Sequence, residues 1–200
     1  MGTVGTAVKV LRTPLRSLLG RSSRVKSGSG RFSIAAESYI TASPEETIDL
    51  GRKLASELAQ PVLVVLLGDL GAGKTTLTKG IVAGLGAAAE EEVTSPTFTL
   101  IHEYGGAKRD APRVYHVDLY RIENARELET LGLEDLLAER AVVIVECGEK
   151  LGPALRQLAP GRAVVEIHLS APSDTERRIV VRESGVSRHR NGEAQSQESE

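Results

Sequence analysis

The sequence has 200 residues, of which 40% are hydrophobic and 26% are charged. These proportions are ordinary for a globular chain of one domain, and they exclude a fibrous repeat and a chain that is disordered throughout. The longest apolar run, at 62–67, is far shorter than the ~20 residues of a membrane-spanning helix, so we expect no association with membranes.

Basic charge is concentrated near the N-terminus. Residues 1–36 hold seven of the 25 basic side chains and no acidic one, so the rest of the chain holds 18 basic against 27 acidic residues. An acidic body is a poor binder of nucleic acid by itself, because affinity for phosphate backbones comes from Lys and Arg. We therefore expect any role on RNA to run through partner proteins.

Three regions are predicted along the chain: a disordered basic extension at 1–36, a domain at 37–186, and a disordered polar tail at 187–200. The extension is rich in Arg, Ser and Gly and contains Pro14, a composition that does not pack. We favour a solvated tail on a cytoplasmic protein. An organelle transit peptide, which is also rich in Arg and Ser and poor in acids, stays open.

Strands and helices alternate in the first half of the domain. A strand is predicted over 32–40, and a Ser-Pro-x-Glu capping box then begins a helix over 43–59. The apolar run at 62–67 is typical of a strand that is buried on both faces. A glycine-rich loop follows, and it leads into a helix over 74–85.

The second half continues the alternation. Two strands are predicted around 98–104 and 113–120, then two short helical segments separated by Gly132. The later strands are AVVIVE, AVVEIHLS and RRIVVRE. This pattern predicts an α/β fold, a P-loop NTPase-like three-layer sandwich whose mixed sheet is parallel at the centre and antiparallel toward an edge.

The segment GDLGAGKT at 68–75 matches the phosphate-binding pattern G-x-x-x-x-G-K-[ST] at every fixed position. Its glycines allow positive φ, so that consecutive N–H groups can surround a phosphate at the start of a helix. Lys74 is expected to neutralise the β- and γ-phosphates, and Thr75 to bind Mg²⁺. The alternative is a glycine-rich turn beside a chance lysine. The residues expected to bind the nucleotide here are Gly71, Ala72, Gly73, Lys74, Thr75 and Thr76.

Two acidic residues, Asp118 and Glu146, lie at or near the ends of predicted strands, where open α/β sheets bind ligands. Glu146 ends an apolar strand in the manner of a Walker B motif, and its carboxylate can hold Mg²⁺ directly or through water. Asp118 can order the attacking water or support the metal shell. The alternative for either acid is an ordinary ion pair with a neighbour such as Arg121.

The loop TSPTFTL at 94–100 carries several hydroxyl groups. In nucleotide switches a loop hydroxyl can reach the γ-phosphate or its metal, and Thr97 is the candidate here. A simple turn into the next strand remains the alternative. We expect His102 and His116 to be hydrogen-bonded strand residues rather than metal ligands, because they lack ligand spacing.

Four segments, in the same order and at similar spacing, resemble the bacterial TsaE (YjeE) family. They are GDLGAGKTTLTKGI, TSPTFTLIHEY, YHVDLYRIE with the following ELETLGLEDLL, and VVIVECGE. The resemblance covers about 41–183. It implies an ATPase required for the threonylcarbamoyl modification of adenosine 37 in tRNAs that read codons starting with A. Family members act with TsaD and TsaB, and the transfer chemistry belongs to TsaD.

The resemblance also implies roles for individual residues. It makes Thr75 and Glu146 the Mg²⁺ ligands, Asp118 an important acid of the site, and Thr47 a nucleotide contact. Where the family usually has Trp after the Walker B glutamate, this chain has Cys147. The implied cofactors are ATP and Mg²⁺, and tRNA is contacted only through the partners.

A small-molecule P-loop kinase is the main alternative. Such a kinase needs an acceptor pocket and usually a basic lid, and no Arg-rich lid segment is evident in the sequence. A GTPase is weaker still, because the guanine-reading pattern N-K-x-D does not occur.

Overall fold

The fold is built on a mixed sheet of eight strands. The computed structural model describes residues 9–11, 36–105, 111–154 and 159–184. The strand order across the sheet is β1-β2-β8-β7-β3-β6-β5-β4. The strands are β1 (Lys9–Leu11), β2 (Ala36–Thr41), β3 (Val62–Leu67), β4 (Ile101–Tyr104), β5 (Val114–Asp118), β6 (Val142–Glu146), β7 (Ala163–Ser170) and β8 (Arg177–Ser184).

The helices are short. They are α1 (Pro44–Ala55), α2 (Lys74–Gly84), α3 (Ala125–Thr130) and α4 (Leu133–Ala138), with 3₁₀ turns η2 (Glu90–Glu92) and η3 (Gly148–Ala154). Within the described ranges, no helix is long and apolar enough to cross a membrane.

The centre of the sheet is parallel and both sides of it are antiparallel. β7, β3, β6 and β5 run parallel to one another, while β4 pairs antiparallel with β5. On the other side β8, β2 and β1 continue the sheet in antiparallel pairs. The predicted parallel centre is confirmed, and antiparallel strands lie toward two edges rather than one.

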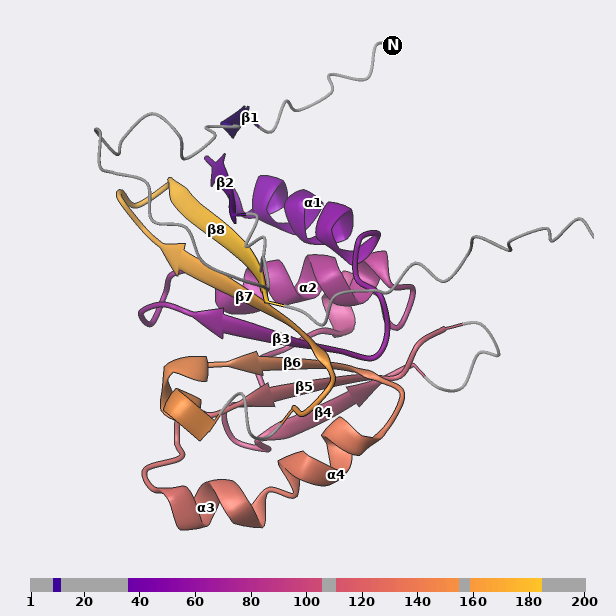
Figure 1. The fold of residues 1–200 in the computed structure, drawn as a ribbon. Coiled ribbons are helices and arrows are strands. Elements are labelled where there is room, and N and C mark those ends of the chain that lie inside the picture. Colours follow the sequence, from indigo (N-terminus) through magenta and orange to yellow (C-terminus); the bar gives the residue numbers. More distant parts are fainter. Residues whose placement is uncertain (1–8, 12–35, 106–110, 155–158, 185–200) are drawn as a thin grey trace, which may run out of the picture.

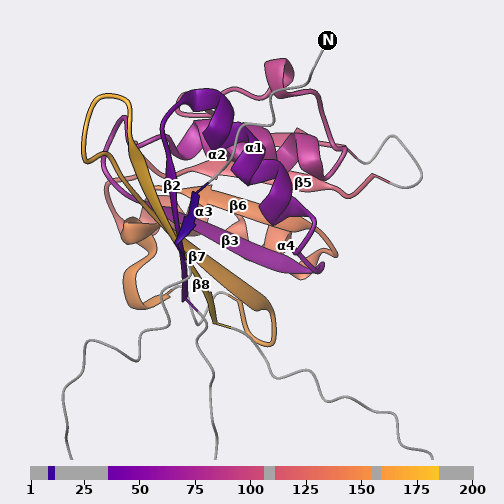
Figure 2. The ribbon, with the colours of Figure 1, turned by 90° about the horizontal axis from the view of Figure 1, so that it is seen from above.

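Helices cover the sheet on both faces (Figure 1, Figure 2). Alternate residues of β3 point to opposite sides: Val64 packs in one core with α1 and α2, and Val65 packs in a second core with residues of α4. Because both faces are buried, β3 is apolar at every position rather than at alternate ones. The three-layer sandwich predicted from the sequence is confirmed.

The N-terminal extension departs from the expectation at three residues. The extension was expected not to pack, but Lys9–Leu11 form β1 and pair antiparallel with β2. β2 would otherwise be an edge strand with unpaired N–H and C=O groups, and such an edge accepts a further strand. The remainder of 1–35, including the start of the strand predicted over 32–40, and the tail at 187–200 lie outside the described residues.

Helix α1 begins as the capping box predicts, because the Ser43 hydroxyl accepts from the Glu46 amide at 3.2 Å. The Glu46 carboxylate in turn accepts from the amide of Ala42 at 2.7 Å. The helix ends at Ala55 rather than near 59, since the amides of 56–58 bond to carbonyls three residues back instead of four.

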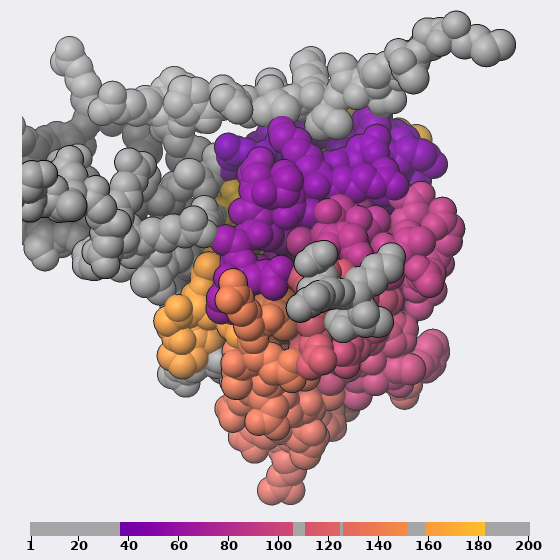
Figure 3. Space-filling view, turned by 90° about the vertical axis from the view of Figure 1, so that its right-hand side faces the viewer, coloured from indigo at the N-terminus to yellow at the C-terminus, as the bar shows by residue number. Residues whose placement is uncertain are grey.

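Helices α1 and α2 cross at very short range. A Cβ atom added at Gly80 of α2 would lie 2.0 Å from the Ile48 carbonyl oxygen, and one added at Gly51 of α1 would lie 2.5 Å from the Leu77 carbonyl oxygen. Arg52 of α1 also pairs with Glu90 of η2, and the two segments meet at the surface (Figure 3). Arg52 is in the last turn of α1, so this ion pair joins that end of the helix to the segment that follows α2.

Candidate functional site

The P-loop, Gly68–Thr75, connects the end of β3 to the start of α2. Its three glycines have positive φ, 141° at Gly68, 80° at Gly71 and 98° at Gly73, as the sequence predicts. A side chain at Gly68 would also collide with the Leu169 carbonyl oxygen, which is 2.2 Å from the position of a Cβ atom. Only glycine therefore fits where the chain leaves β3.

Lys74 lies across the loop and is 7% exposed. Its Nζ donates hydrogen bonds to the Gly68 carbonyl at 2.6 Å and to the Asp69 carbonyl at 2.9 Å. Ala72 is buried beneath the same turn. The ammonium group is thus held at the loop by backbone oxygens, and it remains next to the N-terminus of α2, where anions bind well.

The two acids predicted from the sequence lie side by side. Asp118 and Glu146 are paired residues at the ends of the parallel strands β5 and β6. The P-loop follows β3, which is the other neighbour of β6. Since parallel strands end at one edge of the sheet, this topology brings both carboxylates to the P-loop.

Glu146 is buried and makes contacts with three side chains. Its Oε2 accepts from the Thr75 hydroxyl at 2.9 Å. Its Oε1 lies 2.8 Å from His116 Nε2 and accepts from the Thr78 hydroxyl at 3.3 Å. Thr75 and Glu146, the two residues expected to hold Mg²⁺, are therefore in direct contact.

Asp118 binds the hydroxyl-rich loop rather than an arginine. Its Oδ2 accepts from Thr97 at 2.7 Å and from Ser95 at 2.9 Å, and its Oδ1 accepts from the Tyr120 amide at 2.8 Å. Burial raises the pKa of Asp118, but these hydrogen bonds outweigh it, so the pKa lies below its ordinary value. The guanidinium of Arg121 lies instead over the Phe98 ring, 5.4 Å from its centre.

Two pockets lie on either side of the P-loop and share Gly71, Gly73 and Thr76. The first, called here the P-loop pocket, has a volume of about 420 Å³ and includes Lys74, Thr75, Ser95, Thr97, Asp118, Glu146 and Cys147 in its lining. The second, the α1 pocket, has a volume of about 340 Å³ and is lined also by Ser43, Thr47, Asp174, Thr175 and Arg177.

Thr47 lies at the α1 pocket, but its hydroxyl is already engaged. It donates to the Ser43 carbonyl at 3.0 Å and lies 2.7 Å from the Thr41 hydroxyl. Arg177, from the start of β8, lines the same pocket and packs against the backbone at Gly73. The structure thus brings every predicted site residue to the P-loop pocket or to the α1 pocket, except Ala72, which lies beneath the loop.

Sequence reasoning did not assign four residues to the site that the structure places there: Ser95, Thr78, His116 and Arg177. His116 had a detectable signal, because His116 and Asp118 are two residues apart in one strand and so share a face. Thr78 follows Thr75 by three positions, which places both on one side of α2. Ser95 and Arg177 come from loops and strand ends that only the tertiary fold brings to the site.

The donor set suits a phosphate and a hard cation. Hydroxyl and carboxylate oxygens meet at Thr75 and Glu146, and Mg²⁺ prefers oxygen ligands and keeps several of its waters. Among the residues that the structure describes, no three His, Cys, Asp or Glu side chains form a group that can hold a metal. A cation at this site would therefore need ligands from a phosphate or from water as well.

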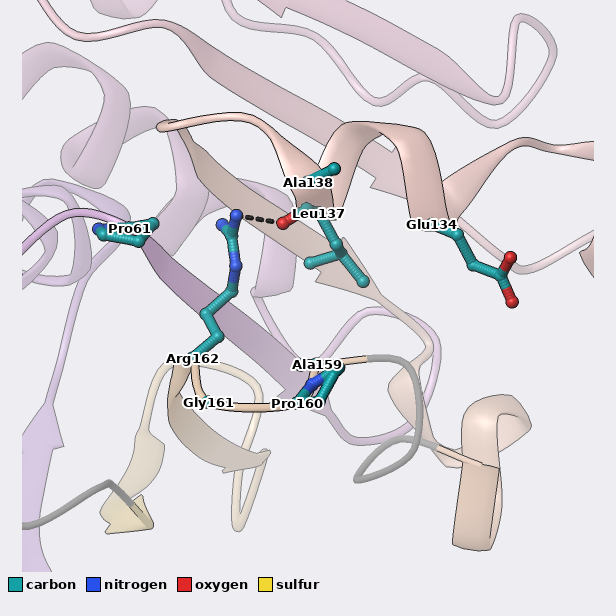
Figure 4. A pocket seen from close by; sticks show the side chains of 8 residues that line it. All are labelled: Pro61, Glu134, Leu137, Ala138, Ala159, Pro160, Gly161 and Arg162. Atoms are coloured by element: carbon teal, nitrogen blue, oxygen red, sulfur yellow. Dashed lines mark hydrogen bonds between the residues drawn. The ribbon is translucent and has the colours of Figure 1, made fainter.

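A further pocket of about 470 Å³ lies at the opposite end of the sheet (Figure 4). It is lined by residues just before β3 and β7, such as Pro61 and Arg162. The buried Arg162 guanidinium donates to the carbonyls of Leu137, Glu139 and Ala141, and it thereby caps the end of α4. All these hydrogen bonds go to backbone carbonyls inside the protein, so Arg162 has a structural role at this pocket.

Comparison with known proteins gives a consistent result. A family model described as "Threonylcarbamoyl adenosine biosynthesis protein TsaE" matches residues 41–179. Proteins named tRNA threonylcarbamoyladenosine biosynthesis protein TsaE are similar to this chain. The one from Haemophilus influenzae is 44% identical over 98 residues, which cover 49% of this chain and 58% of that protein. The one from Bacillus subtilis is 39% identical over 142 residues, which cover 70% and 82%.

Two further matches cover most of the compared protein. The Treponema pallidum protein of the same name is 33% identical over 142 residues, which cover 71% of this chain and 97% of that protein. Among solved structures, the crystal structure of YdiB from Bacillus subtilis matches with a TM-score of 0.53 and 30% identity. That match covers 78% of this chain and 90% of the other.

Proposed function

This chain belongs to the TsaE family of threonylcarbamoyl adenosine biosynthesis proteins, and on that premise we propose that it is a Mg²⁺-dependent ATPase. Its role is to support formation of the threonylcarbamoyl group on adenosine 37 of tRNAs that read codons starting with A. The observation that carries the proposal is the contact between the Thr75 hydroxyl and Glu146 at the start of α2.

In this proposal the P-loop and Lys74 bind the phosphates of ATP. The backbone N–H groups of the loop surround the phosphate oxygens, and the Lys74 ammonium stabilises the negative charge on the β- and γ-phosphates. Thr75 and Glu146 hold Mg²⁺ with their hydroxyl and carboxylate oxygens. When bound, Mg²⁺ neutralises charge that develops on the phosphates as the bond breaks.

Asp118 and Thr97 connect the nucleotide to the loop at 94–100. The low pKa of Asp118 keeps it ionised, and an ionised carboxylate can order the attacking water. Thr97 now donates to Asp118, and a Thr97 hydroxyl that turned to the γ-phosphate would give up this bond. The position of the loop therefore differs between the triphosphate and diphosphate states in this proposal.

Three exposed apolar side chains at or beside the same pocket are the proposed partner surface. Leu70, Phe98 and Tyr120 are large apolar residues with exposed fractions of 81%, 85% and 49%. Leu70 and Tyr120 line the P-loop pocket, and Phe98 follows Thr97, which lines it as well. Exposed apolar groups gathered at one site are typical of protein interfaces. We assign this surface to the TsaD and TsaB assembly.

Binding of tRNA is assigned to those partners. The chain after residue 36 carries an excess of nine acidic residues, which opposes direct binding to a phosphate backbone. The proposed location is the cytoplasm. If residues 1–36 act as a transit peptide, a tagged chain will enter an organelle only when they are present, and that result would move the protein there.

The experiment that tests the proposal measures threonylcarbamoyladenosine in tRNA. Cells that lack the protein are expected to lose the modified nucleoside, as read by mass spectrometry of digested tRNA. The wild-type gene should restore it, and Lys74→Ala should not. Normal levels in cells without the protein, together with phosphorylation of a small-molecule acceptor by the purified chain, would reject this function in favour of a kinase.

A further inference from the structure

We propose that His116 is a positioning residue that fixes the Glu146 carboxylate so that one of its oxygens stays directed at Thr75. The inference rests on the proposed function, in which Glu146 holds Mg²⁺. It adds a residue that touches neither nucleotide nor metal, and it assigns different tasks to the two oxygens of one carboxylate.

The sheet register places His116 beside Glu146 on the neighbouring strand. In the parallel pair of β5 and β6, His116 is opposite Ile144 and Asp118 is opposite Glu146. Side chains two residues apart on a strand share a face, so His116 and Glu146 are diagonal neighbours on the same face of the sheet. His116 Nε2 lies 2.8 Å from Glu146 Oε1, a normal hydrogen-bond distance.

The two Glu146 oxygens have different surroundings. Oε1 faces the protein interior, where His116 and Thr78 bind it, and the His116 side chain has no solvent exposure. Oε2 faces the P-loop pocket and accepts from Thr75. With Oε1 held from behind, rotation of the carboxyl group is restricted, and Oε2 remains toward the position expected for a cation.

The contacts also indicate the tautomer. Because a carboxylate oxygen is an acceptor, the proton lies on Nε2, which donates to Glu146. His116 Nδ1 is buried and has no hydrogen-bond partner among the described residues. With the proton on Nε2, Nδ1 carries no hydrogen, so no N–H group of His116 is buried without a partner. Among the described residues, the ring nitrogens of His116 make one hydrogen bond, and that bond orients Glu146.

This arrangement predicts a specific effect on the metal. Residues that orient a metal ligand typically change metal affinity about 10–100-fold when they are replaced. Loss of the His116 donor should therefore weaken the effect of Mg²⁺ on nucleotide binding by about 10-fold or more. Binding of nucleotide without metal should change little, because the P-loop and Lys74 do not contact His116 in the described structure.

Two amide substitutions separate positioning from packing. In His116→Gln the side-chain NH₂ can occupy the place of Nε2 and donate to Glu146. In His116→Asn the NH₂ falls near the place of Nδ1 and cannot reach it. The measurement is the affinity for a fluorescent ADP analogue, with Mg²⁺ and with EDTA. We expect His116→Gln to keep most of the Mg²⁺ effect and His116→Asn to lose it, with similar affinities in EDTA.

Controls keep the result decisive. His102→Asn, on the neighbouring strand, should leave the Mg²⁺ effect unchanged, since His102 bonds to Thr99 and Tyr104 rather than to Glu146. Thermal midpoints of all variants identify any that fail to fold. Should His116→Asn not fold, Mn²⁺ binding to the His116→Gln complex with ADP, read by electron paramagnetic resonance, tests whether the remaining donor preserves the site.

The inference and the proposed function fail in different ways. If Glu146→Gln loses the Mg²⁺ effect and a folded His116→Asn keeps it, the positioning role is wrong and the function stands. A folded His116→Asn that loses affinity equally with Mg²⁺ and with EDTA also overturns the positioning role. If wild type shows no Mg²⁺ effect at all, both the metal site and the role of His116 are wrong.

Discussion

The Thr75 hydroxyl lies 2.9 Å from Glu146 Oε2, although the two residues are 71 positions apart in the sequence. Thr75 is in the first turn of α2 and Glu146 is the last residue of β6. The contact therefore joins the phosphate-binding loop to the acid that ends the neighbouring strand.

Lys74→Ala is expected to abolish ATP turnover and to weaken nucleotide binding severely. The reason is that a positive charge aimed at the β- and γ-phosphates is lost, and its effect grows as charge develops in the transition state. Turnover and nucleotide affinity are the measurements. Lys79→Ala, on the same helix but outside the P-loop pocket lining, is the matched control and should retain both. Wild-type turnover in Lys74→Ala would refute the site.

Glu146→Gln should lose Mg²⁺-dependent hydrolysis with a smaller effect on nucleotide binding. The neutral amide no longer offers a charged oxygen to the cation, but the phosphate-binding loop is unchanged. Turnover and affinity measured over a series of Mg²⁺ concentrations test this. A variant with the same rate and the same Mg²⁺ dependence as wild type would show that Glu146 is not at the metal.

The contribution of Asp118 to stability should depend on pH. Its pKa in the folded protein is below the ordinary value of ~3.9, so the ionised form favours folding, and this stabilisation is lost as pH falls through the folded pKa. The gap in unfolding free energy between wild type and Asp118→Asn should be constant above about pH 5 and should narrow below about pH 4. Denaturant unfolding at several pH values measures the gap, with the exposed Asp135→Asn as control. A gap that does not change with pH contradicts the prediction.

Cys147 should react slowly with alkylating reagents. Burial, with smaller contributions from nearby carboxylates, raises the pKa of its thiol to about 11, so little thiolate exists near neutral pH. At pH 8 we expect alkylation by iodoacetamide to be about 100-fold slower than that of free cysteine. Because the chain has one cysteine, any alkylation of a thiol that is measured belongs to Cys147. Unfolding in urea should restore the ordinary rate, and fast reaction of the folded protein would disprove the assignment.

Arg162→Leu is expected to destabilise the fold and to spare the nucleotide site. The substitution leaves three backbone carbonyls near the end of α4 without their donor, at a cost of roughly 2–4 kcal/mol in unfolding free energy. Nucleotide affinity should not change, since Arg162 lies at the opposite end of the sheet. The exposed Arg140→Leu is the control and should change stability by less than about 0.5 kcal/mol. Equal stability of the two variants would contradict this reading of the Arg162 pocket.

Local patterns in the sequence predicted the elements that position the site. The glycines of the P-loop and the apolar strand before it predict a strand, a loop and a helix. The acids at the ends of β5 and β6 predict the edge of the sheet at which the site lies. Contacts made between distant segments were not predictable in the same way. The Ser95 and Thr97 hydroxyls reach Asp118 only because the loop at 94–100 folds over β5. The strand β1 likewise depends on the free edge of β2, which no local pattern in the extension reveals.

The close crossing of α1 and α2 has a consequence for nucleotide preference. At Gly51 and Gly80 the two helices touch through backbone atoms, so no side chain lies between them that a substitution can shorten or lengthen. Thr47 on α1 and the P-loop before α2 therefore stand at a separation that is set by the main chain. In the proposed function, in which Thr47 contacts the nucleotide, a larger or smaller nucleoside would meet this fixed separation of the two helices. Nucleotide preference would then be set by the side chains that line the α1 pocket, such as Thr175 and Arg177.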